Sequence, residues 1–243
     1  GPCIPARSAC RPLTSASPRT EPSRVRVFLT GGTGGIGSHI AERLRADGHE
    51  IVALVRPASD RRFLERLGAR LVEGDVCAPE RYRGALRGCD AVVHAAAYVV
   101  QRARWEEYRR VNVEGTRYVL EAAAAAGVSR ALLVSSVSVY GGLTSPDGRV
   151  TEETPTDAPL PDDEVYARSK RMAEEVAWSL HRAGAIDLRV ARPSVNYGDR
   201  DRILVPRLAR YLSLPVAFLV GRGDNTLPVI YLGNTADGAV LAL

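Results

Sequence analysis

The sequence has few cysteines and no long apolar runs. None of its 243 residues falls in a stretch of 18 or more consecutive apolar residues, and the N-terminus has no continuous apolar stretch of the kind that a secretory signal needs. The four cysteines form neither a CxxC pair nor a dense framework, which favours reduced thiols over disulfides. The histidines have no partner spacing either. We therefore expect a cytoplasmic protein without a membrane segment or a metal site.

Lysine is almost absent, although basic residues are common. Of the 33 lysines and arginines, 32 are arginine, and the single lysine is Lys170. A coding preference for arginine over lysine explains the other positions. Because the two side chains are not interchangeable, the exception indicates that position 170 needs an amine.

The formal net charge of +5 raises the question of nucleic-acid binding. Residues 1–24 hold four arginines and one glutamate, so this segment carries +3 and the rest of the chain only +2. The rest shows no basic stripe and no basic residues interleaved with aromatics. We therefore expect no nucleic-acid partner.

Residues 1–24 also differ in composition from the rest of the chain. They are rich in proline, serine and arginine and lack a hydrophobic period, so they bury too little apolar surface to offset the entropy lost on ordering. We interpret them as a disordered tail, although their acid-poor composition also resembles a transit peptide. The whole chain, with 45% hydrophobic and 25% charged residues, is typical of one ordinary globular domain.

From residue 25, short apolar runs alternate with longer amphipathic stretches. This alternation predicts an α/β fold built from βαβ units, that is, a doubly wound parallel sheet. The predicted strands are residues 25–30, 50–55, 69–75, 89–97, 130–137 and 187–193. The main predicted helices run from a glycine-rich loop after the first strand to about residue 47, over 111–127 and over 165–183.

The glycine-rich segment TGGTGGIG lies between the first predicted strand and the first predicted helix. Gly31, Gly34 and Gly37 have the GxxGxxG spacing, which serves a tight turn, the close approach of a pyrophosphate and the packing of helix on strand. In this position the spacing predicts a dinucleotide-binding loop, to which Gly35 and Ile36 also belong, and a Rossmann fold.

Arg56 ends the second predicted strand, where an NAD-binding domain normally has an acidic residue for the adenosine ribose. A forked guanidinium suits the 2′-phosphate of NADP, whereas it offers a diol no acceptor. Because arginine is so common in this chain, a solvated loop residue is the alternative interpretation. The residue favours NADP over NAD as the cofactor.

Tyr166 and Lys170 lie four residues apart on a predicted helix and therefore share one face. A nearby ammonium lowers the pKa of a phenol, ordinarily about 10, toward the range in which it exchanges protons. Ser135 and Ser136 end a predicted strand at the carboxyl edge, where open α/β sheets bind ligands, and a hydroxyl there can hold a substrate oxygen. Together these residues predict an acid/base site.

Taken in order, the motifs resemble those of the extended short-chain dehydrogenases/reductases and the NAD-dependent epimerase/dehydratase group. They are the glycine loop, Asp75-Val76, HAAA at 94–97, Asn112, SSVSVYG at 135–141, YARSK at 166–170 and RPSVNYG at 192–198. The segment ALVRPASDRR, which contains Arg56, is most similar to the dihydroflavonol-reductase and hydroxysteroid-dehydrogenase branch.

The resemblance implies a role for each of these residues. Ser136 would orient the substrate, Tyr166 would be the acid/base and Lys170 would assist it. The remaining cofactor contacts that it implies are Asp75 and Val76 at the adenine, Ala95 and Ala96 near the ribose, Pro193 and Val195 at the nicotinamide amide, and Asn112 shaping the site. Relatives commonly pair through the two helices that here hold Asn112 and Tyr166, so a homodimer is a further expectation.

The chain divides at about residue 193, where the pattern changes. Residues 25–192 are expected to form the NAD(P)-binding Rossmann domain. Residues 193–243 are expected to begin a small substrate lobe and to add the last strand and helix of the Rossmann domain. The sequence stops inside a predicted helix, without a glycine stop, so we expect the lobe to be incomplete.

Three functions are compatible with these residues. The first is an NAD(P)-dependent reductase or dehydrogenase that acts on a carbonyl or alcohol carbon, and Arg56 favours it. A sugar 4,6-dehydratase is disfavoured, because Val137 and Ser138 stand where those enzymes have an acidic pair. The second is a nucleotide-sugar epimerase with tightly bound NAD, which SSVSVYG and the segment 225–243 support. The third is a dinucleotide-sensing protein without catalysis, against which the Tyr/Lys pair argues.

Overall fold

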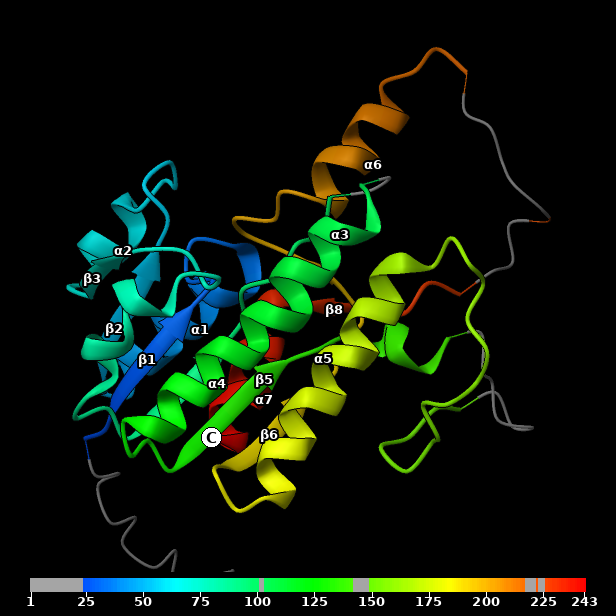
Figure 1. Cartoon of the computed structure of the whole chain (residues 1–243). Coiled ribbons are helices and arrows are strands. Elements are labelled where there is room, and N and C mark those ends of the chain that lie inside the picture. The colour runs from blue at the N-terminus through cyan, green and yellow to red at the C-terminus, as the bar shows by residue number, and fades with distance from the viewer. Residues whose placement is uncertain (1–23, 101–102, 142–148, 217–221, 223–225) are drawn as a thin grey trace, which may run out of the picture.

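The structure, a computed structural model of the chain, describes residues 24–100, 103–141, 149–216, 222 and 226–243 (Figure 1). The disordered tail that the sequence predicts lies, apart from its last residue, outside the described residues.

Six parallel strands form the central sheet, in the order β3-β2-β1-β4-β5-β6. They are β1 (Arg26–Thr30), β2 (Glu50–Val55), β3 (Arg70–Glu73), β4 (Ala91–His94), β5 (Arg130–Val134) and β6 (Asp187–Ala191). Strands β1, β2, β4 and β5 are buried almost throughout, as expected of parallel strands that helices cover on both faces. The predicted doubly wound α/β fold is confirmed.

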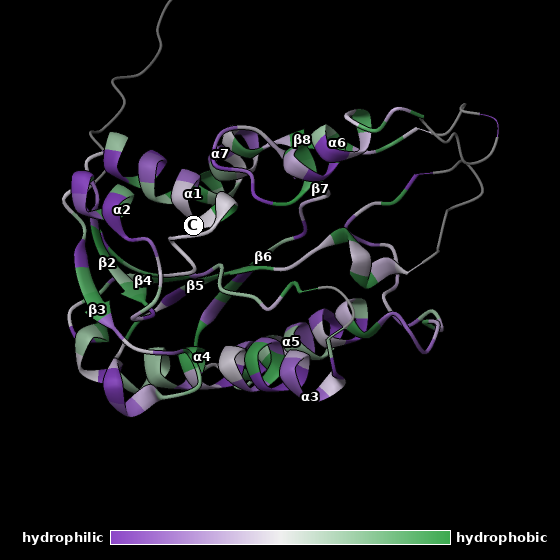
Figure 2. Ribbon diagram, turned by 90° about the horizontal axis from the view of Figure 1, so that it is seen from above, coloured by the Kyte–Doolittle hydropathy of each residue, from purple (hydrophilic) through white to green (hydrophobic). Residues whose placement is uncertain are grey.

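Helices connect the strands and complete three layers. They are α1 (Gly35–Ala46), α2 (Arg62–Arg66), α3 (Trp105–Tyr108), α4 (Gly115–Ala125), α5 (Val165–Arg182), α6 (Leu204–Leu212) and α7 (Leu232–Ala242). Short 3₁₀ turns occupy η1 (Pro79–Arg81), η2 (Arg83–Leu86) and η4 (Val137–Tyr140). Seen from above, α1, α2 and α7 cover one face of the sheet, and α4 and α5 cover the other (Figure 2).

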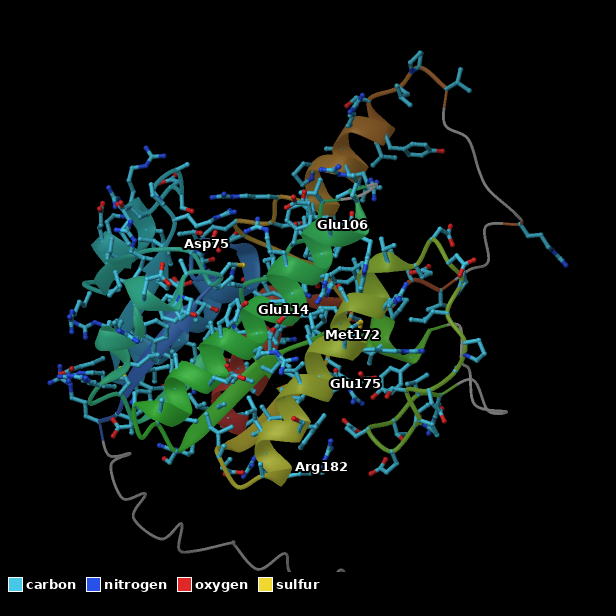
Figure 3. All side chains as sticks on the ribbon, in the orientation of Figure 1. Asp75, Glu106, Glu114, Met172, Glu175 and Arg182 are labelled. Carbon is cyan, nitrogen blue, oxygen red and sulfur yellow. The ribbon has the colours of Figure 1, made fainter. Side chains whose placement is uncertain are left out.

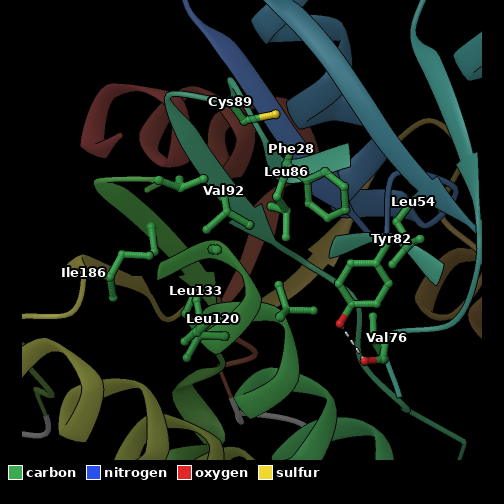
Figure 4. Packing of buried hydrophobic residues seen from close by; sticks show 14 of the residues in the cluster. Phe28, Leu54, Val76, Tyr82, Leu86, Cys89, Val92, Leu120, Leu133 and Ile186 are labelled. Atoms are coloured by element: carbon green, nitrogen blue, oxygen red, sulfur yellow. Dashed lines mark hydrogen bonds between the residues drawn. The ribbon is translucent and has the colours of Figure 1, made fainter. Parts of the chain in front are cut away.

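Each face of the sheet carries its own hydrophobic core. On one face, Leu44 of α1 and Ala239 of α7 pack against the strands. On the other face, Phe28 and Tyr82 lie at the centre of the larger cluster (Figure 4). The Tyr82 hydroxyl donates to the carbonyl of Val76 at 2.9 Å, so this buried polar group is satisfied.

The helix predicted over residues 111–127 begins earlier and is not uniform. A π-helical segment, η3 (Arg109–Glu114), joins α3 to α4, so the helical path begins at Trp105. Within this segment the side chain of Asn112 is buried. Single π-helical turns inside α-helices are frequent at functional sites, and Asn112 is one of the residues that the resemblance singles out.

The strand predicted near the end of the chain does not extend the main sheet, which corrects that part of the prediction for residues 193–243. Strand β8 (Val229–Tyr231) pairs in parallel with β7 (Val195–Tyr197), and the two form a separate sheet. Val229 and Tyr231 remain 46% and 38% exposed, whereas an inner strand of a parallel sheet is buried on both faces. Helix α7, which follows directly, returns to pack against α1.

Helix α6 lies between β7 and β8 in the chain and projects away from the central sheet (Figure 1). None of its residues is buried. The small sheet and α6 therefore form a region that is held far less firmly than the sheet and its covering helices.

Candidate active site

A cleft of about 220 Å³ opens at the carboxyl ends of β1, β2 and β4. The strand order reverses between β1 and β4, and such a switch point is where open α/β sheets bind their ligands. Seven of the predicted cofactor residues line this cleft, namely Gly31, Gly34, Arg56, Asp75, Val76, Ala95 and Ala96. The structure thus brings together residues from four different loops (Asp75 is labelled in Figure 3).

The glycine loop has the tight geometry that the sequence predicts. The amide of Gly34 donates to the carbonyl of Gly31 at 2.9 Å, and Gly31 has a φ of 73°, which favours glycine. A Cβ at Gly31 would lie 2.5 Å from the backbone of Ala95, and one at Gly37 would lie 2.2 Å from the carbonyl oxygen of Gly31. Only glycine fits at these two positions, so backbone rather than side chain forms the floor of the cleft.

Gly35 and Ile36 occupy the first turn of α1, beside the cleft rather than on its lining. The first amides of a helix have no partner within it and point toward any anion placed there. A pyrophosphate therefore fits this loop, and the open path from Gly31 to Asp75 fits the rest of a dinucleotide.

Ser136, Tyr166 and Lys170 meet at the carboxyl end of β5. Ser136 follows β5, and Tyr166 lies in the first turn of α5, which brings the phenol to the serine hydroxyl. Lys170 lies one turn further along α5, and its Nζ donates to the carbonyl of Val134 at 2.7 Å. The three residues predicted to be catalytic are therefore neighbours in space, although 34 positions separate Ser136 from Lys170.

The two titratable members of this group are shifted in opposite directions. Burial raises the pKa of Tyr166 above its ordinary value, and the hydrogen bond with Ser136 opposes this shift. Burial lowers the pKa of Lys170 to about 8, while the carboxylate of Glu174 opposes that shift. The sequence predicts that the ammonium lowers the pKa of the phenol. In the structure, burial is the largest influence on the pKa of Tyr166, and the amine of Lys170 donates to the carbonyl of Val134.

A buried ion pair between Glu174 and Arg192, which the sequence analysis missed, lies close to Lys170. Glu174, one helical turn further on, is 4% exposed and accepts from Nη2 of Arg192 at 2.6 Å and from its Nε at 3.0 Å. Nη1 of Arg192 donates to the hydroxyl of Tyr140 at 2.7 Å. The four-residue spacing from Lys170 places Glu174 on the same helix face, but no sequence signal connects Glu174 with Arg192.

Asn112 links the helix that carries it to the loop after β4 and to α5. Its Oδ1 accepts from the amide of Tyr98 at 2.6 Å, and its Nδ2 donates to the carbonyl of Tyr98 at 3.1 Å and to Oγ of Ser169 at 2.9 Å. Tyr98 itself lines the cleft. Asn112 therefore does not line the cleft but positions a residue that does.

A row of aromatic rings connects the cleft with the phenol of Tyr166. The ring centres of Tyr98 and Tyr108 are 5.3 Å apart, and those of Tyr108 and Tyr166 are 6.3 Å apart. Edge-on contacts of this kind are favourable, so the three rings hold one another in place. Ser136, Tyr166 and Lys170 do not line the cleft themselves, and these ring contacts connect them to Tyr98, which does.

His94, at the end of β4, has a structural role. It is 1% exposed, and its Nδ1 and Nε2 lie 2.7 Å and 3.1 Å from the hydroxyls of Thr30 and Thr116. Burial lowers the pKa of His94 to about 3, so the ring is neutral in the physiological range.

Pro193 and Val195 do not line the cleft. The carbonyl of Pro193 accepts from the amide of Val137 at 3.1 Å, which continues the pairing of β5 and β6 past their ends. Val195 lies in β7 with 39% of its surface exposed. Their contact with a nicotinamide stays a prediction.

Within residues 24–243, apart from the undescribed gaps, no group of three or more His, Cys, Asp or Glu side chains could hold a metal ion. No helix in the described part of the chain is long and apolar enough to cross a membrane.

Comparison with known proteins identifies the family and supports the fold. Residues 27–243 match the NAD dependent epimerase/dehydratase family. The chain is 31% identical over 221 residues to 2-alkyl-3-oxoalkanoate reductase of Stenotrophomonas maltophilia, covering 90% of this chain and 65% of that protein. It is 29% identical over 239 residues to the decarboxylating sterol-4-alpha-carboxylate 3-dehydrogenase of Bos taurus, covering 97% of this chain and 65% of that protein. The chain thus spans less than two thirds of the length of these relatives.

Solved structures agree. The dTDP-glucose 4,6-dehydratase of Streptomyces venezuelae, with NAD bound, superposes with a TM-score of 0.75 at 32% identity over 90% of this chain and 72% of that one. The UDP-glucose-4-epimerase of Stenotrophomonas maltophila, also with NAD bound, gives a TM-score of 0.76 at 25% identity over 90% of this chain and 74% of that one. The six-stranded sheet, the glycine-floored cleft and these matches show that the chain belongs to the NAD-dependent epimerase/dehydratase family of extended short-chain dehydrogenases/reductases, a family of nicotinamide-dependent enzymes.

Proposed function

We propose that this chain is the cofactor-binding and catalytic part of an NADP-dependent reductase that converts a small-molecule ketone or aldehyde to an alcohol, or the reverse. The observation that carries the proposal is the meeting of Ser136, Tyr166 and Lys170 beside the dinucleotide cleft. Arg56, exposed at the edge of the cleft, supports NADP because its guanidinium makes no hydrogen bond or ion pair with a described residue and suits a phosphate.

Tyr166 supplies the proton in the direction of reduction. Its raised pKa keeps the phenol protonated at neutral pH, so the O–H can donate to the carbonyl oxygen of a substrate held beside it. Ser136, which touches the same phenol, can donate to that oxygen as well and fix its position. A bound nicotinamide would supply the hydride for the carbonyl carbon, and with the proton from Tyr166 the carbonyl compound would become the alcohol.

Lys170 stabilises the phenolate that proton donation leaves behind. With a pKa of about 8, the amine is mostly charged at neutral pH. Within the described part of the chain only the carbonyl of Val134 accepts from Nζ of Lys170, which leaves two N–H donors for the phenol and for a cofactor ribose. The carboxylate of Glu174, which is paired with Arg192, opposes the loss of the Lys170 proton.

A nucleotide-sugar epimerase is the second candidate, and one observation favours it. The UDP-glucose-4-epimerase and the dTDP-glucose 4,6-dehydratase named above were solved with NAD, not NADP. An epimerase would use the same three residues but return the hydride to the other face of the sugar. The reductase is preferred because Arg56 suits a 2′-phosphate and because curated relatives include ketone reductases and a sterol dehydrogenase.

The test is turnover by the intact protein with NADPH and a panel of ketones, compared between wild type and Tyr166→Phe. Loss of a general acid is expected to lower kcat by about 10²- to 10⁴-fold while the dissociation constant for NADPH stays within about twofold. Tyr118→Phe, which removes the hydroxyl of a half-buried tyrosine on α4, is the matched control and should turn over as wild type. Undiminished turnover by Tyr166→Phe would refute the assigned acid, and NADPH binding without any turnover would favour a dinucleotide sensor.

A further inference from the structure

A second hollow, of about 510 Å³, adjoins the cofactor cleft. The two share Thr33 and Arg56, so they form one continuous surface at the end of β2. The rest of its lining comes from two places far apart in the sequence: the turn of residues 57–60, and Arg202, which precedes α6. Arg202 is therefore a contribution of the C-terminal region to the cofactor side of the molecule.

The loop that carries Arg202 is anchored to helix α1 through Arg200. Nε of Arg200 donates to Oγ of Ser38 at 3.0 Å, and its Nη2 pairs with Glu42 at 2.5 Å. The guanidinium also lies 4.2 Å from the ring centre of Phe63. Arg200 has a φ of 62°, a conformation that a non-glycine residue keeps only where its surroundings impose it.

Asp201 fixes the other side of the loop. Its carboxylate accepts from the backbone amides of Ile203 at 2.7 Å, of Leu204 at 3.2 Å and of Val205 at 2.7 Å, and so caps the start of α6. Arg202 follows directly, between an anchored residue and a capped helix. The loop therefore fixes the backbone at Arg202, and the exposed side chain of this residue lines the hollow.

The charges around the hollow suit a phosphate monoester. The guanidinium of Arg56 makes no hydrogen bond or ion pair with any described residue, and Arg202 faces the carboxylate of Asp60. That carboxylate is already bound by Arg62, whose Nε and Nη2 donate to it at 2.9 Å and 2.7 Å. The acid is therefore neutralised by a third arginine, and two guanidinium groups remain to face a dianion. The hydroxyls of Thr33 and Ser59 add two donors at the same surface.

We infer that Arg202 is a second ligand of the 2′-phosphate of NADP, facing Arg56 across the hollow, and hence a cofactor-specificity residue that the C-terminal region supplies. The inference rests on the proposed use of NADP. Arg56 follows β2, as expected for this fold, whereas Arg202 lies 146 positions later and no sequence spacing connects them. Two forked cations on one phosphate discriminate against a bare ribose better than one.

The test is calorimetric titration of the chain with 2′,5′-ADP and with 5′-AMP, which differ by the 2′-phosphate and need no turnover. Arg202→Ala is expected to weaken the affinity for 2′,5′-ADP about tenfold, because one partly solvated charge-assisted contact is lost. Its affinity for 5′-AMP should stay within about twofold of the wild-type value. Arg202→Lys should recover part of the affinity, because the charge returns without the fork. Arg210→Ala, which removes an exposed arginine of α6 that does not line the hollow, is the matched control and should bind both ligands as wild type does.

Three other results would overturn the inference in distinguishable ways. If Arg56→Ala weakens 2′,5′-ADP and Arg202→Ala does not, the phosphate has no second ligand here, but the proposed function stands. If Arg202→Ala weakens the affinity for both ligands equally, the residue supports the loop and does not bind the 2′-phosphate. If the wild-type chain prefers 5′-AMP, and NADH over NADPH, then the proposed NADP dependence fails together with the inference.

Discussion

Helices α1 and α6 show how differently the two regions of the molecule are held. Six residues of α1 are buried against the sheet and α7, whereas none of the residues of α6 is buried. Both helices nevertheless have an apolar face, and on α6 it leaves Leu208 and Leu212 49% and 67% exposed. A sequence pattern therefore indicates that a helix has an apolar face, but the fold decides whether that face is covered.

The same contrast separates the functional residues. Ser136, Tyr166 and Lys170 are held by elements of the buried sheet region, and Lys170 is itself 3% exposed. Arg202 belongs to the exposed region and is positioned only by its anchored loop. Under the two proposals above, the buried region carries out the chemistry, and the exposed region contributes to the discrimination between cofactors.

The largest expected effect is on the free energy of unfolding, and it tests the difference in packing between α1 and α6. Leu44→Ala on α1, where the side chain is fully buried, should lower the free energy of unfolding by about 3 kcal/mol, because it removes apolar contacts and leaves a cavity. Leu208→Ala on α6 should lower it by less than about 0.5 kcal/mol. Urea unfolding with equal m-values measures both. Similar losses for the two variants would show that α6 is covered in solution.

The second effect concerns the buried amine. The pKa of Lys170 is about 8 in the folded chain and near 10.5 when unfolded, so between these values the unfolded chain holds the proton that the folded chain has released. The stability of wild type should therefore rise with pH in this window, relative to Lys170→Met, by on the order of 3 kcal/mol. Chemical unfolding of both proteins at pH 7.5 and 10.5 gives the difference. A pH-independent gap would mean that the amine is not desolvated.

The smallest expected effect is a change in stability from a substitution on α7, and it tests whether this helix belongs to the firmly held region. Gly238 lies on the exposed side of α7, where an added Cβ meets no atom within 4 Å. Gly238→Ala should therefore stabilise the chain by about 1 kcal/mol, through helix propensity alone. The same change at Gly48, which also has free space but a φ of 83°, should destabilise it by about 1 kcal/mol. Thermal unfolding compares the two; no gain from Gly238→Ala would indicate that α7 is frayed.

Much of the sheet could be predicted from the sequence, because buried parallel strands are short apolar runs between turn residues. The second strand, predicted over 50–55, is β2 (Glu50–Val55), and the fourth, predicted over 89–97, is the shorter β4 (Ala91–His94). The sheet to which β8 belongs could not be predicted, because an apolar run of three residues has the same pattern in the main sheet and in a small one. Its exposure, not its sequence, distinguishes the two.

The candidate site was predictable where one local pattern carries the chemistry. The glycine spacing and the Tyr166/Lys170 pair each lie within nine residues. The contacts of Asn112 with Tyr98, the ion pair of Glu174 with Arg192, and Arg202 at the hollow join segments that only the fold brings together. The π-helical turn around Asn112 was missed because it changes hydrogen bonding without changing the apolar period.

The central claim is that the site binds NADP reversibly and reduces a carbonyl. The most direct measurement denatures the purified protein, identifies any released nucleotide by mass spectrometry, and titrates fresh protein with NADPH and NADH by nicotinamide fluorescence. We predict that no nucleotide is released and that NADPH binds at least tenfold more tightly than NADH. Released NAD, with no preference for NADPH, would contradict the claim, because a tightly kept NAD is what an epimerase requires.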